Sequence, residues 1–360
     1  MTTDAVGGVW DYSLELAAGL ARSGVDIVLA TMGPPPGPQQ RARAEAIPGL
    51  TLVEGNYRLE WMPDSDLDVV RAGRWLLGLE KRIAPDLIHV NGYAHAALPW
   101  RAPCLVVAHS CVLSWWRAVK GEEAPREWHL YARRVEAGLR AAAAVVAPTG
   151  AMLRILQEIY GPLARTVTIW NGRRPGGYAP AAKENFIFGA GRLWDEAKNL
   201  AVLQELAPDL SWPVVLAGSW QRPEGGGRPP AGVRFLGRLP PEEMAFWQGR
   251  AAVYALPARY EPFGLSILEA ALSGCALVLG DIPTLRELWE GAALFVPPDD
   301  RDRLRAALEE LAVAPARRAR LGRAARERAR SYTSERMTAV YLELYGEVAS
   351  RPAARTESAS

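Results

Sequence analysis

The stretch from Ala258 to Ala271, "ARYEPFGLSILEAA", directly follows an apolar run that ends at Leu256. We expect the apolar run to be a buried strand and a helix to begin near Gly264. The apolar stripe of that helix is formed by Leu265, Leu268 and Leu272. A buried strand that passes through a short loop into an amphipathic helix is the repeating unit of α/β proteins.

The same alternation of strand and helix extends over most of the chain. The apolar runs that we expect to be strands are 25–30, 87–90, 105–108, 144–147, 167–170, 186–189, 214–217, 233–236, 252–256, 276–279 and 293–296. The expected helices include 10–22, 67–83 and 126–140, and residues 301–348 are expected to be helical. Because the strands are continuously apolar, the sequence predicts parallel sheets that are covered on both faces.

A segment rich in glycine and proline at 171–180, "NGRRPGGYAP", interrupts the alternation and is interpreted as a linker. We therefore predict one doubly wound α/β domain over residues 1–173 and a second over 174–331. Residues 332–349 are predicted to form a helix that crosses back to the first domain, and the tail 350–360 is predicted to be disordered. Two such domains place a ligand in the cleft between them, at the carboxyl ends of the strands.

Two carboxylates in the opening stretch are candidate ligand-binding groups. On the predicted helix Glu269 lies about 40° from the centre of the apolar stripe, so part of its carboxylate is buried. Such a group needs donors, which are either Arg or Lys in an internal ion pair or the hydroxyls of a ligand. Glu261 lies in the loop before the helix, where the backbone N–H groups near Phe263, Gly264 and Leu265 lack helical partners. This combination suits a ligand that carries hydroxyls and phosphate.

A second group of candidates follows the expected strand 186–189, in the sequence "GAGRLWDEAKN" at 189–199. The Gly-x-Gly here is not a dinucleotide fingerprint, because Trp194 stands where the third glycine belongs. Arg192 leaves the end of the strand and Lys198 is expected to open the next helix, so both cations can point into the cleft. The alternative is that both are solvated surface residues.

Composition excludes several classes of protein. Lys and Arg number 42 against 40 Asp and Glu, and the net charge of +2 gives no reason to expect a nucleic-acid partner or more than peripheral membrane contact. Three cysteines without C-x-x-C spacing indicate reduced core residues of a cytoplasmic protein. No apolar run reaches the roughly 18 residues of a membrane span.

Taken together, these motifs resemble family 4 retaining glycosyltransferases, which have the two-domain GT-B fold. The seven residues between Glu261 and Glu269 match the E-x7-E pattern of that family. Further segments that resemble the family are "VGGVW" at 6–10, "PDLIHVNGY" at 85–93, "VVAHS" at 106–110, "GRLWDEAKNL" at 191–200, "WNG" at 170–172, "VRFLGRL" at 233–239 and "DIPTLREL" at 281–288.

The resemblance implies a role for each candidate residue. Arg192 and Lys198 would bind the donor diphosphate, Glu269 the ribose hydroxyls, and Glu261 the hydroxyls of the transferred sugar. The backbone of Phe263–Leu265 would donate N–H groups to sugar and phosphate, and residues 236–239 would hold the base. The turn that contains Gly7 and Gly8 would lie against the donor phosphates.

Histidines and tryptophans of the first domain are further candidates. His109 follows the expected strand 105–108, and in the family a histidine at this place contacts the donor sugar near its anomeric carbon; the alternative is a core or surface histidine. His89 and His95 are weaker candidates for the acceptor side. Trp115 and Trp116 are read equally well as sugar-stacking rings or as core packing.

We expect no metal and no cofactor. Asp64-Ser65-Asp66 matches the D-x-D metal pattern of the other glycosyltransferase fold, but before the helix 67–83 we interpret Ser65 or Asp66 as an N-cap. Arg192, Lys198 and helix dipoles would then stabilise the leaving group.

The resemblance implies a retaining transferase that moves a hexose from a nucleotide-diphosphate sugar to an acceptor hydroxyl on a carbohydrate or glycolipid. The alternatives are a sugar-nucleotide-binding protein that has lost transfer and a nucleotide-dependent oxidoreductase, which would need the fingerprint that Trp194 removes. The sequence leaves the base, the hexose, the acceptor and the oligomeric state open.

One feature departs from the family, which begins with an apolar strand of about five to seven residues. Residues 1–5, "MTTDA", are too short and too polar for such a strand, so we expect the first strand to be missing. This suggests a wrongly assigned start codon or a truncated chain.

Overall fold

The computed structural model describes residues 1–222 and 225–350, which divide into two compact units. The first contains residues 1–114 and 123–172 together with the chain from Ser334 onward, and the second contains residues 115–122 and 173–333. The expected helix at 332–349 is helix α13 (Ser334–Ala349), which belongs to the first unit. That residues 115–122 group with the second unit was not expected. Except for Ser350, the predicted disordered tail lies outside the described residues.

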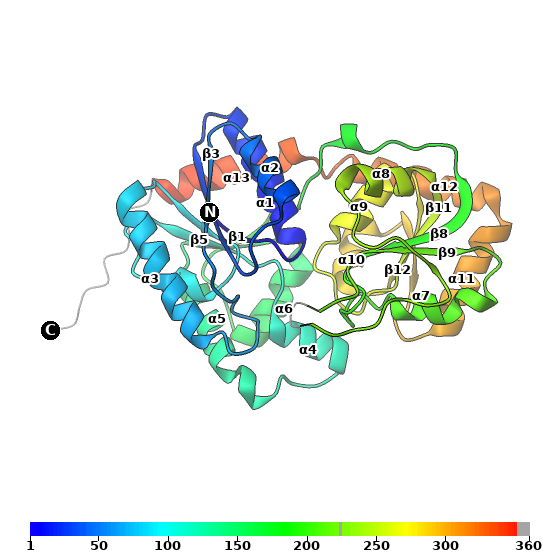
Figure 1. The fold of residues 1–360 in the computed structure, drawn as a ribbon, viewed down its shortest axis with the longest axis horizontal. Coiled ribbons are helices and arrows are strands. Elements are labelled where there is room, and N and C mark those ends of the chain that lie inside the picture. The colour runs from blue at the N-terminus through cyan, green and yellow to red at the C-terminus, as the bar shows by residue number, and fades with distance from the viewer. Residues whose placement is uncertain (223–224, 351–360) are drawn as a thin grey trace. The chain divides into compact units, whose positions relative to one another are not determined.

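The first unit contains two parallel sheets, of order β1-β2-β3 and β4-β5-β6-β7 (Figure 1). The strands are β1 (Thr2–Asp4), β2 (Ile27–Met32), β3 (Leu50–Glu54), β4 (Ile88–Val90), β5 (Cys104–Val107), β6 (Ala144–Ala147) and β7 (Thr166–Thr168). The helices are α1 (Gly8–Arg22), α2 (Pro38–Glu45), α3 (Asp66–Ile83), α4 (Val112–Lys120, whose last six residues belong to the second unit), α5 (His129–Ala141), α6 (Gly150–Tyr160) and α13. Short 3₁₀ turns lie at Ala94–Ala97 and Arg126–Trp128.

The expectation that the first strand is missing is wrong, because Thr2–Asp4 form β1. This strand pairs in parallel with β2, with Thr2 opposite Ala30 and Asp4 opposite Met32. The ladder extends back to residue 1: the amine of Met1 donates to the carbonyl of Val28 at 2.8 Å, and the N–H of Ala30 donates to the carbonyl of Met1 at 2.8 Å. The strand is polar in sequence and nevertheless buried.

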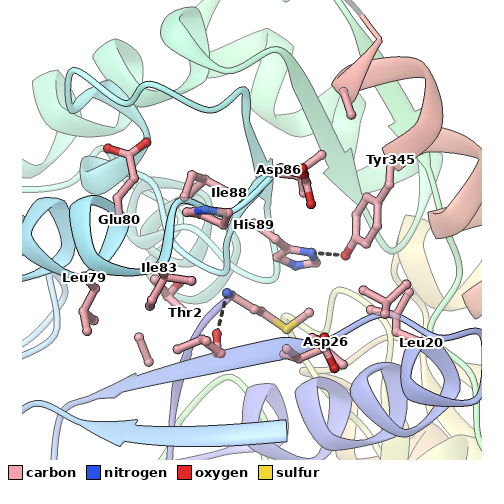
Figure 2. A pocket seen from close by; sticks show the side chains of 18 of the residues that line it. Thr2, Leu20, Asp26, Leu79, Glu80, Ile83, Asp86, Ile88, His89 and Tyr345 are labelled. Atoms are coloured by element: carbon pink, nitrogen blue, oxygen red, sulfur yellow. Dashed lines mark hydrogen bonds between the residues drawn. The ribbon is translucent and has the colours of Figure 1, made fainter. Parts of the chain in front are cut away.

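A cavity of about 640 Å³ lies beyond the amino end of β1. Its walls come mainly from the amino ends of β2 and β4, from α3 and from α13, and Figure 2 shows Leu79, Ile83 and Ile88 among the side chains that line it. The amine of Met1 lies at this cavity, and its burial lowers its pKa to about 6, while Cys104 has a smaller opposing effect. The cavity lies at the amino ends of strands, whereas ligand sites of α/β proteins lie at their carboxyl ends.

The second unit contains a single six-stranded parallel sheet of order β10-β9-β8-β11-β12-β13. The strands are β8 (Glu184–Ala190), β9 (Val214–Ala217), β10 (Arg234–Phe235), β11 (Ala251–Leu256), β12 (Ala276–Gly280) and β13 (Ala293–Val296). The helices are α7 (Ala201–Leu206), α8 (Pro241–Arg250), α9 (Leu265–Leu272), α10 (Pro283–Trp289), α11 (Arg301–Val313) and α12 (Pro315–Ala329), and short 3₁₀ turns lie at Pro175–Gly177 and Ala207–Asp209. The core contains Phe188, Tyr254 and Trp289, each with no exposed surface.

The strand order of the second unit defines where a ligand can bind. The order of the strands switches between β8 and β11, which are parallel neighbours: β9 and β10 follow β8 on one side of the sheet, and β12 and β13 follow β11 on the other. In open parallel sheets the crevice at such a switch point, outside the carboxyl ends of the strands, is the ligand site. The loops after β8 and β11 carry Arg192, Lys198 and Glu261. The sequence therefore places its main candidates at the switch point.

Among the residues that the structure describes, no helix is both long enough and apolar enough to span a bilayer.

Candidate active site

Lys198 and Glu261 form an ion pair at the switch point of the second unit. Lys198 Nζ donates to Glu261 Oε2 at 2.7 Å, and the two side chains are only 14% and 13% exposed. Lys198 lies in the loop after β8, three residues before α7 rather than at the start of a helix as expected. Glu261 is held at both ends, because its Oε1 accepts from the N–H of Phe263 at 3.3 Å and its carbonyl accepts from Thr284 Oγ1 at 2.7 Å.

The amino end of α9 stands beside this pair. Gly264 is its N-cap, in the left-handed conformation with φ of +86°, and a Cβ at Gly264 would lie 2.6 Å from Ile267 Cδ1 and 3.3 Å from Glu261 Cγ. The first N–H groups of a helix have no partner within it and favour anions. Ser266, in the first turn, is tied to β11 through a 2.8 Å hydrogen bond from Tyr254 Oη. The expected helix start near Gly264 is thus confirmed.

Arg192 lies at the end of β8 and is anchored by an acidic residue that the sequence reasoning missed. Its guanidinium donates to Asp195 Oδ2 at 2.6 and 3.2 Å and remains 39% exposed. Asp195 also accepts from the N–H of Ala197 at 3.0 Å and from Trp115 Nε1 at 3.2 Å. Burial raises the pKa of Asp195, but Arg192 and Lys198 outweigh it and hold that pKa below its usual value. Asp195 therefore orients one of the two candidate cations and remains ionised.

Glu269 is buried on α9 and makes an internal ion pair. Arg173 Nε donates to Glu269 Oε1 at 2.8 Å, and the side chains are 7% and 11% exposed. Of the two alternatives left by the sequence, the ion pair is therefore present. Whether the same carboxylate also binds ribose hydroxyls stays a prediction.

The candidates of the first unit lie at two other strand ends. Gly7 is the N-cap of α1 and Gly8 is its first residue, so the predicted turn leads into the predicted helix. His109 follows β5, and its Nε2 is 2.8 Å from Asn91 Oδ1. Burial lowers the pKa of His109 to about 3, so the imidazole is neutral at physiological pH.

His89 and His95 have structural partners. His89 is 2% exposed, its Nδ1 is 2.6 Å from Tyr345 Oη, and Figure 2 shows this contact. Burial and, to a smaller extent, the nearby Met1 amine lower the pKa of His89 to about 3. His95 Nε2 is 3.0 Å from the carbonyl of Val69.

Ser65 occupies the N-cap position of α3, as predicted, but its hydroxyl donates to the carbonyl of Glu60 and makes no capping bond. Asp66 begins α3 and accepts a 2.6 Å bond from Arg134. Within residues 1–222 and 225–350, no three His, Cys, Asp or Glu side chains converge as metal ligands would.

Tryptophans 115 and 116 pack edge to face, with ring centroids 5.8 Å apart. Trp115 Nε1 bonds to Asp195, and Lys120 lies over the Trp115 ring at 5.8 Å. The structure thus joins Trp115 to the anchor of Arg192.

A doubly wound parallel sheet whose switch-point loops carry two cations and two carboxylates is typical of enzymes that bind phosphorylated, hydroxyl-rich substrates. Sequence comparison extends this to a family. The model described as "Glycosyltransferase Family 4" matches residues 6–175, and the one described as "Glycosyl transferases group 1" matches residues 177–328. The chain belongs to the family 4 glycosyltransferases and has the GT-B fold.

Individual relatives agree with this assignment. Glycogen synthase of Mycobacterium tuberculosis is 26% identical over an alignment of 362 positions. The match covers 90% of this chain and 86% of the relative. Sucrose-phosphate synthase of Thermosynechococcus elongatus has a similar structure, with a TM-score of 0.79, 20% identity and coverage of 96% and 98%. The Anabaena protein HepE, solved in complex with UDP-glucose, gives a TM-score of 0.72 at 17% identity, with coverage of 96% and 99%. At these identities the two solved structures show the fold alone.

Proposed function

We propose that this glycosyltransferase moves a hexose from a nucleotide-diphosphate sugar to an acceptor hydroxyl, with retention at the anomeric carbon and without a metal ion. The observation that carries the proposal is the Lys198–Glu261 pair beside the amino end of α9, at the switch point of the second unit. This pair combines a cation for phosphate with a carboxylate for sugar hydroxyls.

The cations of the site match the charge of a leaving diphosphate. When the glycosidic bond breaks, negative charge grows on the diphosphate, and fixed cations and helix N–H groups that face it lower the barrier. Lys198 supplies a point charge, Arg192 a forked donor that Asp195 holds in place, and α9 its first N–H groups. These groups would act in place of a metal ion.

Glu261 would orient the transferred sugar by accepting hydrogen bonds from its hydroxyls. Its backbone is fixed by Thr284, and its side chain is within hydrogen-bond distance of Lys198 and Phe263. Placing the sugar correctly against the leaving group and the acceptor contributes to rate without any covalent step. No protein nucleophile is invoked: the acceptor hydroxyl attacks the face that the diphosphate leaves, and a phosphate oxygen takes the acceptor proton.

The relatives support a nucleotide-sugar donor and a carbohydrate acceptor. HepE was solved with UDP-glucose, and a relative whose match covers 90% of this chain is named a glycogen synthase. We therefore propose a carbohydrate or glycolipid acceptor and a cytoplasmic enzyme with no nucleic-acid partner and at most peripheral membrane contact.

A binding screen followed by a transfer assay tests the proposal. UDP-, GDP- and ADP-sugars are compared by thermal shift, where a ligand at 100 times its Kd adds about 2.7 kcal/mol of stability. The donor that binds is then assayed with glycan and glycolipid acceptors, with and without EDTA, and the anomeric configuration of the product is determined by NMR. Retained configuration and EDTA resistance support the proposal, whereas inversion, metal dependence or binding without transfer would contradict it.

A further inference from the structure

Asn91 joins the two sheets of the first unit and contacts both His89 and His109. It follows β4 directly, and its backbone N–H donates to Thr2 Oγ1 at 2.9 Å. Its side-chain Nδ2 donates to the carbonyl of Thr2 at 2.8 Å and to Ser13 Oγ at 3.3 Å. Its Oδ1 lies 3.0 Å from His89 Nε2 and 2.8 Å from His109 Nε2.

These contacts fix the orientation of the Asn91 amide. The carbonyl of Thr2 can only accept, so the amide atom that faces it must be the NH₂ group. The atom that faces both histidines is then the amide oxygen, which can accept two hydrogen bonds but donate none. Both His89 and His109 must therefore carry a proton on Nε2.

The tautomer of each ring follows, because a neutral imidazole with a proton on Nε2 has a lone pair on Nδ1. In His89 that lone pair accepts from Tyr345 Oη at 2.6 Å. Within the described part of the chain, His109 makes only the hydrogen bond to Asn91, so its Nδ1 is left as an acceptor. The His109 ring is held further by Tyr12, whose ring meets it edge to face at 4.5 Å.

We infer that Asn91 is a positioning residue, which holds His109 as the neutral Nε2–H tautomer so that Nδ1 accepts a hydrogen bond from a sugar hydroxyl. That the hydroxyl belongs to a sugar rests on the proposed function. The tautomer of His109 does not depend on it. A lone pair on Nδ1 selects a hydroxyl and repels a phosphate oxygen. In this form His109 is an acceptor at Nδ1 and does not serve as a cation for the diphosphate.

Few titratable groups of the described residues surround Asn91 and His109. They are Tyr12 of α1, His89 of β4, Tyr341 and Tyr345 of α13, and the amine of Met1. Burial raises the pKa of each of the three tyrosines, so they are neutral at physiological pH. Asn91 is neutral at every pH, so it fixes the tautomer without charging the ring.

The first test needs neither a variant nor a substrate. The chain has four histidines, so long-range ¹H–¹⁵N spectra of the ¹⁵N-histidine-labelled protein can be assigned with single His→Gln variants. We expect His109 to be a neutral Nε2–H tautomer throughout pH 5 to 8. A proton on Nδ1, or an imidazolium within this range, would overturn the inference even if transfer is found.

The second test changes the charge of the positioning residue. In Asn91→Asp the carboxylate still accepts from both rings, but it raises their pKa and converts His109 to imidazolium, whose Nδ1 donates. With the donor found in the binding screen, the variant should lose kcat about tenfold per pH unit below the raised pKa, while the wild type stays flat. Asn56→Asp, at an exposed position, controls for the added charge.

Asn91→Ala separates positioning from folding. It removes the amide oxygen without adding charge, so His109 should become a mixture of tautomers in the folded protein, as judged by circular dichroism and the same NMR spectra. A folded Asn91→Ala protein with His109 still entirely Nε2–H, or an Asn91→Asp protein with an unchanged pH profile, would contradict the role of Asn91. Absence of transfer with every donor would instead refute the proposed function and leave the NMR result standing.

Discussion

Lys198 and Glu261 are 63 residues apart in the sequence, and their side chains meet through a hydrogen bond of 2.7 Å between Nζ and Oε2. The two loops that carry them follow β8 and β11, which are adjacent in the sheet. A cation and a carboxylate that are mostly withdrawn from water attract each other more strongly than surface charges do. A substrate with phosphate and hydroxyl groups can replace each partner's contact with one of its own.

Removing either member of this pair should abolish transfer. One full charge on the protein that faces one full charge on the diphosphate, at about 4 Å and an effective dielectric constant of about 20, contributes up to about 4 kcal/mol. This corresponds to about a thousandfold in rate. Lys198→Ala and Glu261→Ala are each expected to lower kcat/KM by up to that factor while leaving the circular dichroism spectrum unchanged. The control is Arg140→Ala, which breaks an exposed ion pair of similar length to Glu136 on α5. Near-normal transfer by both site variants would refute the assignment.

Gly264→Ala should lower both stability and activity. The residue has φ of +86°, where an L-residue costs about 1–2 kcal/mol, and its Cβ would press on Ile267 at 2.6 Å. The resulting shift moves the first turn of α9 and Glu261. Gly291→Ala is a matched control, because Gly291 has φ of +78° but open space around its Cβ. Thermal unfolding should show a loss for both variants, and kinetics a loss for Gly264→Ala alone.

The second unit was predictable from sequence because its inner strands, β8, β9, β11 and β12, are mostly buried on both faces. Each therefore appears as a continuous apolar run, and the six-stranded sheet contains all six runs that were expected between residues 186 and 296. The E-x7-E carboxylates were also found, because both lie in one local segment. Pairings across the fold are different: the partner of Glu269 is Arg173, 96 residues away, and no local pattern indicates it. Asp195 pairs locally with Arg192, three residues before it, but only the fold brings Trp115 to it.

The two strands that the sequence did not reveal lack continuous apolar runs. Thr2–Asp4 is polar, yet Thr2 and Thr3 are 6% and 3% exposed, because their hydroxyls bond to Asn91 and Ser13 inside the unit. Hydrogen bonds replace the apolar burial that the prediction relied on. β3 (Leu50–Glu54) lies at the sheet edge with no fully buried residue, so it needs no apolar run.

The amine of Met1 should make the stability of the protein depend on pH between about 6 and 8. Its pKa is about 6 in the folded protein, where burial disfavours the charge, and 8.0 when unperturbed. Between these values the unfolded chain binds more protons, so stability rises with pH. Below pH 6 the full penalty of about 3 kcal/mol applies, and above pH 8 none. Urea unfolding from about pH 7.5 to 8.5 measures the upper part of this rise, because there His89 and His109 are neutral in the unfolded chain as well as in the folded protein, where their pKa values are about 3.

Variants with added residues ahead of Met1 separate the charge from the cavity. Four serines convert the buried amine to a peptide N–H and should flatten the pH dependence without filling the apolar cavity. Four valines should do the same and also fill part of the 640 Å³, continuing the β1 ladder along Ile27 and Val28. We expect a higher thermal midpoint for the valine variant than for the serine variant. Equal midpoints would mean that the cavity does not accept an extended apolar segment.

Removing one member of the Arg173–Glu269 ion pair should lower the free energy of unfolding strongly, whereas replacing both members with apolar residues should lower it much less. Both side chains are buried, so Arg173→Met removes the positive charge that pairs with the Glu269 carboxylate in the interior and is expected to destabilise the fold by about 3–5 kcal/mol. The double variant Arg173→Met/Glu269→Leu removes both charges and should recover most of that loss in urea unfolding. Donor binding then separates structure from recognition: if Glu269 also holds the ribose, the double variant will be stable but will bind the nucleotide sugar at least tenfold more weakly. Unchanged donor affinity in a stable double variant would restrict Glu269 to its structural role.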